Sequence, residues 1–254
     1  VLVLDGEELA GAKQNRVLNT TILLREKSET IIPVSCTEQG RWSYSTRNFE
    51  ESGYIIPAAV RSVKNRSVGN NLKHGGMYHS DQGAVWESIA YMARENKVNT
   101  PTGAMRDILE AKQGDLDEFL QYFPLETGQN GLLVMVNGKV IGMDLFSNAT
   151  VFEKLYAKLI KSYVMDALIE KPAKGRVVSR KKAVGFLKEI LDCAENTFDS
   201  VGYGRDYRYE GKKIVGSALV HDHSVIHAAF FQITGTEKGG YMSSASRRRA
   251  YRVQ

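Results

Sequence analysis

From Leu133 to Gly142 the sequence is LVMVNGKVIG, two runs of strand-forming residues on either side of Asn137-Gly138. Asn-Gly tolerates the positive φ angles that a two-residue hairpin turn requires, so this stretch predicts an antiparallel β-hairpin. Weaker versions of the pattern surround Asp5-Gly6 and Glu210-Gly211. Strands and helices do not alternate regularly along the chain, which disfavours Rossmann and barrel folds and favours antiparallel sheets.

Further strands are indicated by β-branched and aromatic residues in several short segments. These segments are residues 17–24, 29–34 and 40–45, and a C-terminal pair, 214–220 and 225–233, that turns at Asp222-His223-Ser224.

Two long segments, 149–170 and 179–199, repeat apolar residues at i, i+3, i+4 and i+7, which is typical of amphipathic helices. Shorter helices are predicted over 80–96, 102–113 and 115–122, and Lys171–Gly175 is interpreted as a linker. No interior linker marks a domain boundary. We therefore predict an α+β fold, with antiparallel β-hairpins and a meander packed with two long amphipathic helices and several shorter ones, in a single domain spanning residues 1–254.

The composition is that of an ordinary globular protein, with 254 residues, 43% hydrophobic and 25% charged. No apolar run approaches the roughly 18 residues of a membrane span, and no signal peptide is recognised. The two cysteines, Cys36 and Cys193, are far apart in the sequence. These features predict a cytoplasmic protein without a membrane partner.

The net charge of +5 is mild, which makes a nucleic-acid partner unlikely on sequence grounds. Basic residues concentrate in two places, the acid-free stretch 58–80 and the tail 246–252. The tail is expected to be a solvated end, and RNA binding through it is a weaker alternative.

The region from Arg41 to His79 is the strongest candidate for ligand binding. Guanidinium groups suit phosphate and aromatic faces suit a nucleobase, so a phosphorylated small molecule is the predicted ligand. The helix start near Ser80-Asp81 could add its dipole. The candidate ligand-binding residues are Arg41, Trp42, Arg61, Arg66 and Lys73. The competing interpretation is that these are simply solvated basic loops.

Glu38 and Asp144 are the candidate catalytic carboxylates, because an acid beside an incoming phosphate can act as a general base. Asp206 is a further candidate. No metal site is predicted and no cofactor is assigned. Whether the protein is an enzyme stays open.

Two other chemistries are weighed and set below these. Cys36 is followed by an arginine after four intervening residues rather than the five of a cysteine phosphatase loop, so a buried structural thiol is favoured. His221, His223 and His227 could ligate a metal, but the turn predicted at His223 separates the outer two.

Three segments resemble a prokaryotic family of unknown function named for its association with ADP-ribosylglycohydrolase and rhodanese-phosphatase proteins, the ARPP family. They are LDGEELAGAKQNR (4–16), IPVSCTEQGRW (32–42) and VNGKVIGMDLF (136–146), and the second is the most specific. The resemblance extends over nearly the whole chain.

The resemblance implies a place in NAD or ADP-ribose metabolism, and Glu38, Arg41 and Asp144 lie on its matching segments. On this basis the protein is expected to bind or process ADP-ribose or a related phosphorylated nucleoside. Arg41, Arg61, Arg66 and Lys73 would hold phosphate, Trp42 would stack on a base, and Glu38 or Asp144 would act as the base. The alternative function is a non-catalytic interaction or oligomerisation module, such as a homo-oligomer, that uses its long helices and any unpaired sheet edge.

Overall fold

The computed structural model describes residues 1–170 and 178–233. The linker Lys171–Gly175 and the basic tail 246–252 lie outside the described residues. The helices described are α1 (Ala58–Lys73), α2 (Gln82–Glu95), α3 (Met105–Ala111), α4 (Gln113–Gln121), α5 (Ala149–Ile169) and α6 (Arg180–Leu191). The strands described are β1 (Leu2–Val3), β2 (Glu7–Gly11), β3 (Arg16–Leu18), β4 (Ile22–Leu23), β5 (Val34–Cys36), β6 (Phe49–Ile55), β7 (Gly131–Val136), β8 (Lys139–Phe146), β9 (Ala194–Asp199), β10 (Arg205–Glu210), β11 (Ile214–His221) and β12 (Ser224–Gln232).

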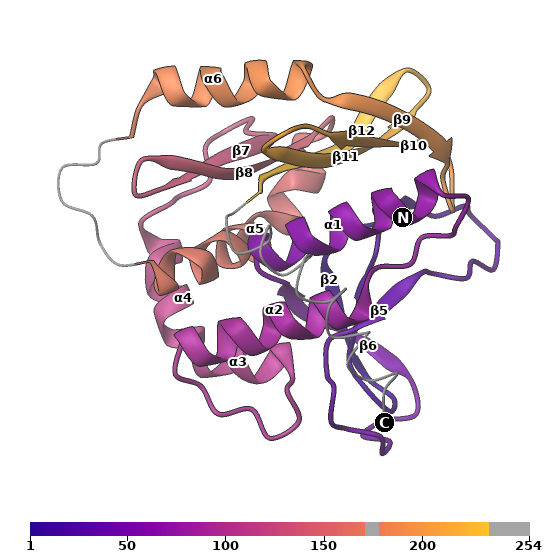
Figure 1. Cartoon of the computed structure of the whole chain (residues 1–254), viewed down its shortest axis with the longest axis vertical. Helices are drawn as coiled ribbons and strands as arrows, with labels where there is room; N and C mark the ends of the chain where they lie inside the picture. Colours follow the sequence, from indigo (N-terminus) through magenta and orange to yellow (C-terminus); the bar gives the residue numbers. More distant parts are fainter. Residues whose placement is uncertain (171–177, 234–254) are drawn as a thin grey trace, which may run out of the picture.

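An antiparallel sheet of order β7-β8-β12-β11-β10-β9 forms the largest layer of the structure. Helix α6 lies over one face of this sheet, and α1 and α5 lie over the other (Figure 1). Because side chains alternate along a strand, neighbouring residues pack against opposite faces of the sheet. Phe230 packs with Phe186 of α6, whereas Phe231 packs with Tyr163 of α5. The predicted α+β class is confirmed.

The hairpin predicted at Asn137-Gly138 is confirmed. The pairing of β7 with β8 extends as far as Val136 and Lys139, and the two turn residues have φ of 50° and 68°. The hairpin predicted at Glu210-Gly211 also forms, between β10 and β11. The C-terminal pair β11 and β12 turns at Asp222-His223 as expected.

The hairpin predicted at Asp5-Gly6 is wrong. β1 pairs with β4, and β2 pairs with β3 and β6 in a second sheet of order β5-β3-β2-β6. Gly6 has a φ of +86°, and a Cβ there would lie 2.9 Å from Cδ of Arg61. The turn therefore lets the backbone pass closely over a buried side chain of α1 instead of reversing the strand onto itself.

Other segments also differ from the sequence prediction. The strand predicted over 29–34 does not form, and β5 begins only at Val34. The helix predicted over 179–199 ends at Leu191, and β9 follows as the edge partner of β10, with Phe198 opposite Asp206. Tertiary pairing thus overrides a local helical pattern. The strand predicted over 40–45 is an irregular loop, and β6 begins only at Phe49.

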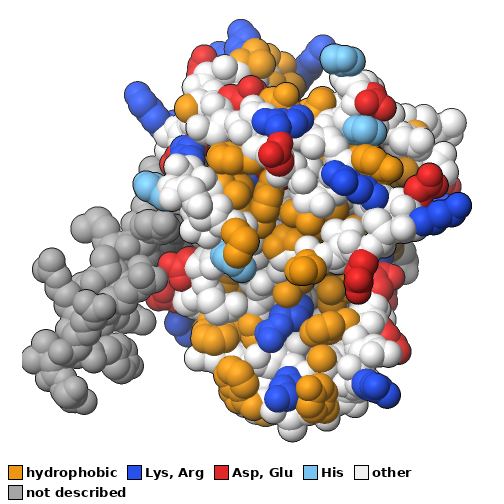
Figure 2. Space-filling model, turned by 90° about the vertical axis from the view of Figure 1, so that its right-hand side faces the viewer, with side chains coloured by type: hydrophobic (Ala, Val, Ile, Leu, Met, Phe, Trp, Pro, Cys, Tyr) orange, Lys and Arg blue, Asp and Glu red, His pale blue; other side chains and the backbone are white. Residues whose placement is uncertain are grey.

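The acid-free stretch interpreted as basic loops is mostly helix α1, which begins after Pro57. The sequence pattern did not predict this helix, because polar residues interrupt its apolar period. Arg61 and Lys64, three residues apart, are both fully buried. On the face shown in Figure 2, Lys and Arg side chains are spread among acidic and hydrophobic ones and do not form one large patch.

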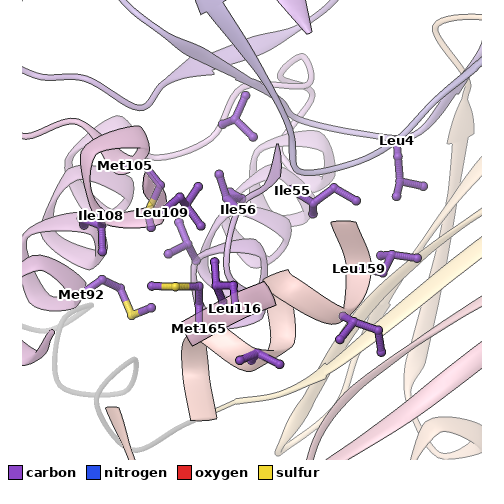
Figure 3. Packing of buried hydrophobic residues seen from close by; sticks show 14 of the residues in the cluster. Leu4, Ile55, Ile56, Met92, Met105, Ile108, Leu109, Leu116, Leu159 and Met165 are labelled. Carbon is purple, nitrogen blue, oxygen red and sulfur yellow. The ribbon is translucent and has the colours of Figure 1, made fainter. Parts of the chain in front are cut away.

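The main hydrophobic core joins the helices below the large sheet to the end of β6. Figure 3 shows side chains of α2, α3, α4 and α5 converging near Ile56. Met105, Ile108 and Leu109 supply the contribution of α3, and all three are fully buried. This core fixes α1 and α5 against the sheet and so positions the polar residues that they carry.

Candidate functional site

Asp144, one of the candidate catalytic carboxylates, lies on β8 and is fully buried. Arg61 of α1 donates two hydrogen bonds to it, from Nη1 to Oδ2 at 3.0 Å and from Nη2 to Oδ1 at 2.7 Å. The Tyr163 hydroxyl donates to Oδ2 at 2.7 Å. Burial opposes ionisation of Asp144, but the attraction of Arg61 and hydrogen bonds from His227 and Arg61 hold its pKa well below the usual range. Asp144 is thus a buried carboxylate that side chains of three other elements bind.

His227 of β12 extends this buried network. Its Nε2 lies 2.9 Å from Oδ1 of Asp144, and its Nδ1 lies 2.8 Å from the Thr21 hydroxyl. That hydroxyl also accepts a hydrogen bond from the backbone N–H of Asp5. The imidazole thus connects Thr21 to Asp144 inside the buried network.

Asp5 supplies the second carboxylate of the network. Its side chain pairs with Lys64 and lies 3.5 Å from Nε of Arg61, and all three side chains are fully buried. Burial lowers the pKa of Lys64, and Asp5 opposes that shift. Two carboxylates, Asp5 and Asp144, thus face two cations, Arg61 and Lys64, in this network.

Glu38, the other candidate catalytic carboxylate, forms a separate cluster with Arg41. The Nε of Arg41 donates to Oε1 at 2.9 Å, and Nη2 lies 2.7 Å from Oε2. The Thr102 hydroxyl and the backbone N–H of Asn15 also donate to the carboxylate. Burial alone would raise the pKa of Glu38, but these hydrogen bonds outweigh it and lower the pKa. Glu38 therefore holds the Arg41 guanidinium in place.

Glu8 of β2 belongs to the same end of the small sheet and was not predicted. Its side chain is fully buried, and its Oε1 accepts a hydrogen bond from Thr37 at 3.1 Å. Burial raises its pKa to about 7, although the Thr37 and Ser52 hydroxyls oppose the shift. Glu8 and Glu38 thus have pKa values moved in opposite directions. Glu8 directly follows Glu7, and nothing in the local sequence marks it as a buried acid.

Trp42, the predicted stacking residue, lies on the loop that follows Arg41. Its side chain is 71% exposed and that of Tyr44 is 67% exposed. Lys13 lies 5.2 Å from the Tyr44 ring centroid. The loop thus offers aromatic faces and basic groups, but they lie on an open surface.

Arg66 and Lys73, two of the predicted phosphate ligands, line one small pocket between α1 and the strands β10 and β11. Arg208 of β10, which the sequence analysis did not single out, lines it too. The enclosed volume is about 10 Å³, the room of a single water. Lys73 pairs with Glu210, whose side chain is 37% exposed. The structure therefore brings two predicted cations and one unpredicted cation to one place.

Two of the three guanidinium nitrogens of Arg208 are hydrogen-bonded within the protein. Its Nε and Nη2 contact Asp206 at 2.6 and 2.9 Å, and Nη2 also donates to Thr20 at 2.7 Å. Its Nη1 is buried and has no hydrogen-bond partner. The Oδ1 of Asn65, which lines the same pocket, is also buried without a partner. Unsatisfied buried polar atoms of this kind are rare, and they make the pocket suited to a polar ligand atom.

A larger polar hollow adjoins this pocket at Asn70, which lines both. Its volume is about 700 Å³, within the range of small-molecule sites. It lies between the C-terminal half of α1 and the start of α2, where Asp81 accepts a hydrogen bond from the Ala84 N–H. The other lining residues are Ser67, Asn71, His74, His79, Ser80, Gln82 and Gly83.

The predicted site residues therefore occupy three separate places. Arg61 and Asp144 are in the buried network, and Glu38 and Arg41 are in the cluster beside the exposed Trp42 loop. Arg66 and Lys73 line the small pocket. Sequence reasoning missed Glu8 and Arg208, and it considered His227 only as a metal ligand.

The weaker alternatives can also be located. Cys36 is buried, with its thiol 3.0 Å from the backbone oxygen of Glu38. His221 and His227 lie on either side of the β11–β12 turn. Among the described residues, no group of three or more His, Cys, Asp or Glu side chains is arranged to hold a metal ion. No helix within 1–170 or 178–233 has both the length and the apolar character needed to span a membrane.

Comparison with curated proteins and with solved structures finds no match for this chain. A family model does match, over residues 1–231, and it is described as the ARG and Rhodanese-Phosphatase-superfamily-associated Protein domain. This confirms the resemblance carried by segments 4–16, 32–42 and 136–146. The chain belongs to the ARPP-1 family.

Proposed function

We propose that the protein binds ADP-ribose or a related phosphorylated nucleoside at the C-terminal half of α1. A phosphate group would sit at the pocket formed by Arg66, Lys73 and Arg208, and the nucleoside would occupy the adjoining hollow. The observation that carries this proposal is the buried Nη1 of Arg208, a charged donor without a hydrogen-bond partner on a residue that lines the pocket.

The size of the pocket suits one phosphate oxygen rather than a whole phosphate. A terminal oxygen is about as large as the water that the cavity could hold. It would accept a hydrogen bond from Nη1 of Arg208, while the remaining oxygens would face Arg66 and Lys73. For this, Lys73 exchanges Glu210 for the phosphate, which costs little because the ion pair is partly exposed.

The adjoining hollow supports a ligand with a polar sugar. Asparagine, serine and histidine side chains dominate its lining, and they donate and accept hydrogen bonds as hydroxyl groups do. Asn70 connects the two parts of the proposed site. Tyr78, whose ring lies 5.5 Å from the Arg208 guanidinium, supplies an aromatic surface nearby.

Processing of the ligand, with Glu38 or Asp144 as base, stays a prediction, as does stacking by Trp42. Both carboxylates are bound by arginines, so neither could take up a proton without weakening an ion pair. The geometry gives more support to binding than to catalysis.

Binding can be tested on the full chain by thermal shift and calorimetry with ADP-ribose, NAD, AMP, ribose 5-phosphate and inorganic phosphate. We expect the phosphorylated nucleosides at millimolar concentration to raise the melting temperature by about 2–4 °C, and phosphate alone to compete with them. Lys73→Ala should weaken binding, whereas Lys188→Ala, at an exposed lysine of α6, should not. Absence of any shift across the panel would contradict the proposal.

The alternative function, a non-catalytic interaction module, is supported by one different observation. The β7 edge of the large sheet is apolar and has no neighbouring strand among the described residues.

A further inference from the structure

The two edges of the large sheet differ in character. β9 forms one edge and carries Glu195 and Asp199, charges of the kind that prevent an exposed edge from pairing. β7 forms the other edge with the sequence GLLVMV, which contains no charged residue and no proline. All six residues of β7 are partly exposed. An edge strand of this composition is a template for a further strand.

A groove of about 1010 Å³ runs along this apolar edge. β7, α5 and the start of α6 contribute to its lining, as does the segment that follows α4. Three aromatic side chains at this groove remain well exposed: Phe119 at 38%, Tyr122 at 70% and Phe123 at 48%. Exposed apolar side chains gathered along a groove are typical of an interaction site.

Charges at the groove differ between its two ends. Glu126 lies near the start of β7, because Gln129 bonds to its backbone N–H and to the Gly131 oxygen. At the hairpin end, Lys182 of α6 donates to the Gly138 oxygen at 2.6 Å, and Arg180 lines the groove. Glu170 is also at this end, where it accepts a hydrogen bond from Asn137. The hairpin end thus has two basic groups and one acidic group, and the opposite end has an acid.

We propose that this edge binds a second copy of the chain, with the two β7 strands paired antiparallel across a twofold axis. Antiparallel pairing places the start of each β7 opposite the hairpin end of the other. Glu126 then faces Arg180 of the partner subunit, and the same contact occurs twice. The exposed aromatic side chains of each copy enter the groove of the other. The two six-stranded sheets become one continuous sheet, and the uncharged edge is removed.

Charge reversal tests this arrangement on the full chain. Sedimentation equilibrium of the wild type should give twice the 28.3 kDa chain mass at micromolar to tens of micromolar concentration. Glu126→Lys and Arg180→Glu should each raise the dimer dissociation constant about tenfold, because each change opposes like charges at two symmetric contacts. The double variant should restore the wild-type constant. Glu195→Lys on β9 is the matched control and should leave it unchanged.

Hydrogen exchange gives a second readout. Amide exchange of residues 131–136 should slow as the protein concentration rises, and exchange of residues 194–199 on β9 should not. A monomer at about 100 µM would overturn the proposal, since stable dimers of this interface class form well below that concentration. A dimer insensitive to both single reversals, or one whose β9 amides become protected, would also overturn it.

Discussion

Arg61 and Asp144 are 83 residues apart in the sequence, yet they form a two-pronged ion pair with both side chains fully buried. The pair joins α1 to the second strand of the large sheet. Because Arg61 also lies 3.5 Å from Asp5, one guanidinium connects the N-terminal segment, a helix and the sheet. The arginine that the sequence suggested as a phosphate ligand therefore contacts two carboxylates within the protein.

Arg61→Met should destabilise the protein by about 3–5 kcal/mol, because it leaves the Asp144 carboxylate buried without its cation. Urea unfolding followed by circular dichroism would measure the change. Arg94→Met, at an arginine that is 70% exposed, is the control and should change stability by less than about 0.5 kcal/mol. If Arg61→Met lowers the free energy of unfolding by less than about 1 kcal/mol, the pair stabilises the protein no more than an exposed ion pair does.

Glu8 should make the protein less stable as the pH rises. Its pKa is about 7 in the folded state and near 4.5 when unfolded, so between these values the folded state holds a proton that the unfolded state has lost. Stability from this group is complete below pH 4.5 and is lost as the pH approaches 7. Glu8→Gln should therefore resemble the wild type at pH 5 and exceed it by roughly 3 kcal/mol at pH 8.

Comparison of urea midpoints at pH 5 and pH 8 tests this prediction, with Glu110→Gln as the control at an exposed acid. Glu38 and Arg106 are the charged groups that act on Glu8, and they remain in both variants. If the wild type and Glu8→Gln show the same pH dependence, the carboxyl titrates as an ordinary acid.

Gly69→Ala should stabilise the protein and weaken phosphate binding together. A Cβ at Gly69 would lie 3.9 Å from Cβ of Arg208, an ordinary contact, and alanine favours the helix by about 0.5–1 kcal/mol. The methyl group would also take space from the pocket that Gly69 lines. Calorimetry with ADP-ribose should show binding weakened about tenfold.

Gly185→Ala is the matched control for this change, since it sits within α6 and a Cβ there meets nothing within 4 Å. It should give the same gain in melting temperature without a change in binding. Unaltered affinity in Gly69→Ala would place the phosphate elsewhere.

Trp42→Ala distinguishes the two candidate ligand surfaces. The side chain is mostly exposed, so unfolding free energy should change by less than about 0.5 kcal/mol. If the ligand lies at α1, affinity for ADP-ribose should also be unchanged. A weakening of tenfold or more in Trp42→Ala, with normal binding by Gly69→Ala, would move the site to the loop that carries Trp42.

Local sequence signals recovered the parts of the fold that depend on local chemistry. Asn137-Gly138 specified its turn because few residue pairs accept two positive φ angles. The apolar period of α5 predicted that helix almost to the residue. The helical pattern over 179–199 failed after Leu191, because the choice there depended on β10, which lies later in the chain.

The site was less accessible to sequence reasoning. Arg61 was interpreted as a phosphate ligand or a solvated charge, because its burial depends on carboxylates that come from Asp5 and Asp144. Arg66 and Lys73 were identified by charge alone, and their meeting with Arg208 follows from the packing of α1 on β10. A single sequence does not show which distant segments come into contact.

The contacts of Arg61 have a consequence for how the molecule unfolds. If the N-terminal segment unfolded, Lys64 and Arg61 would lose their contacts with Asp5. If the large sheet unfolded, Arg61 would lose Asp144. If either sheet unfolded first, a charged side chain would stay buried without its partner. The free-energy cost of that state couples the unfolding of the two sheets. Calorimetry should record a single heat-absorption peak in which both sheets lose structure together.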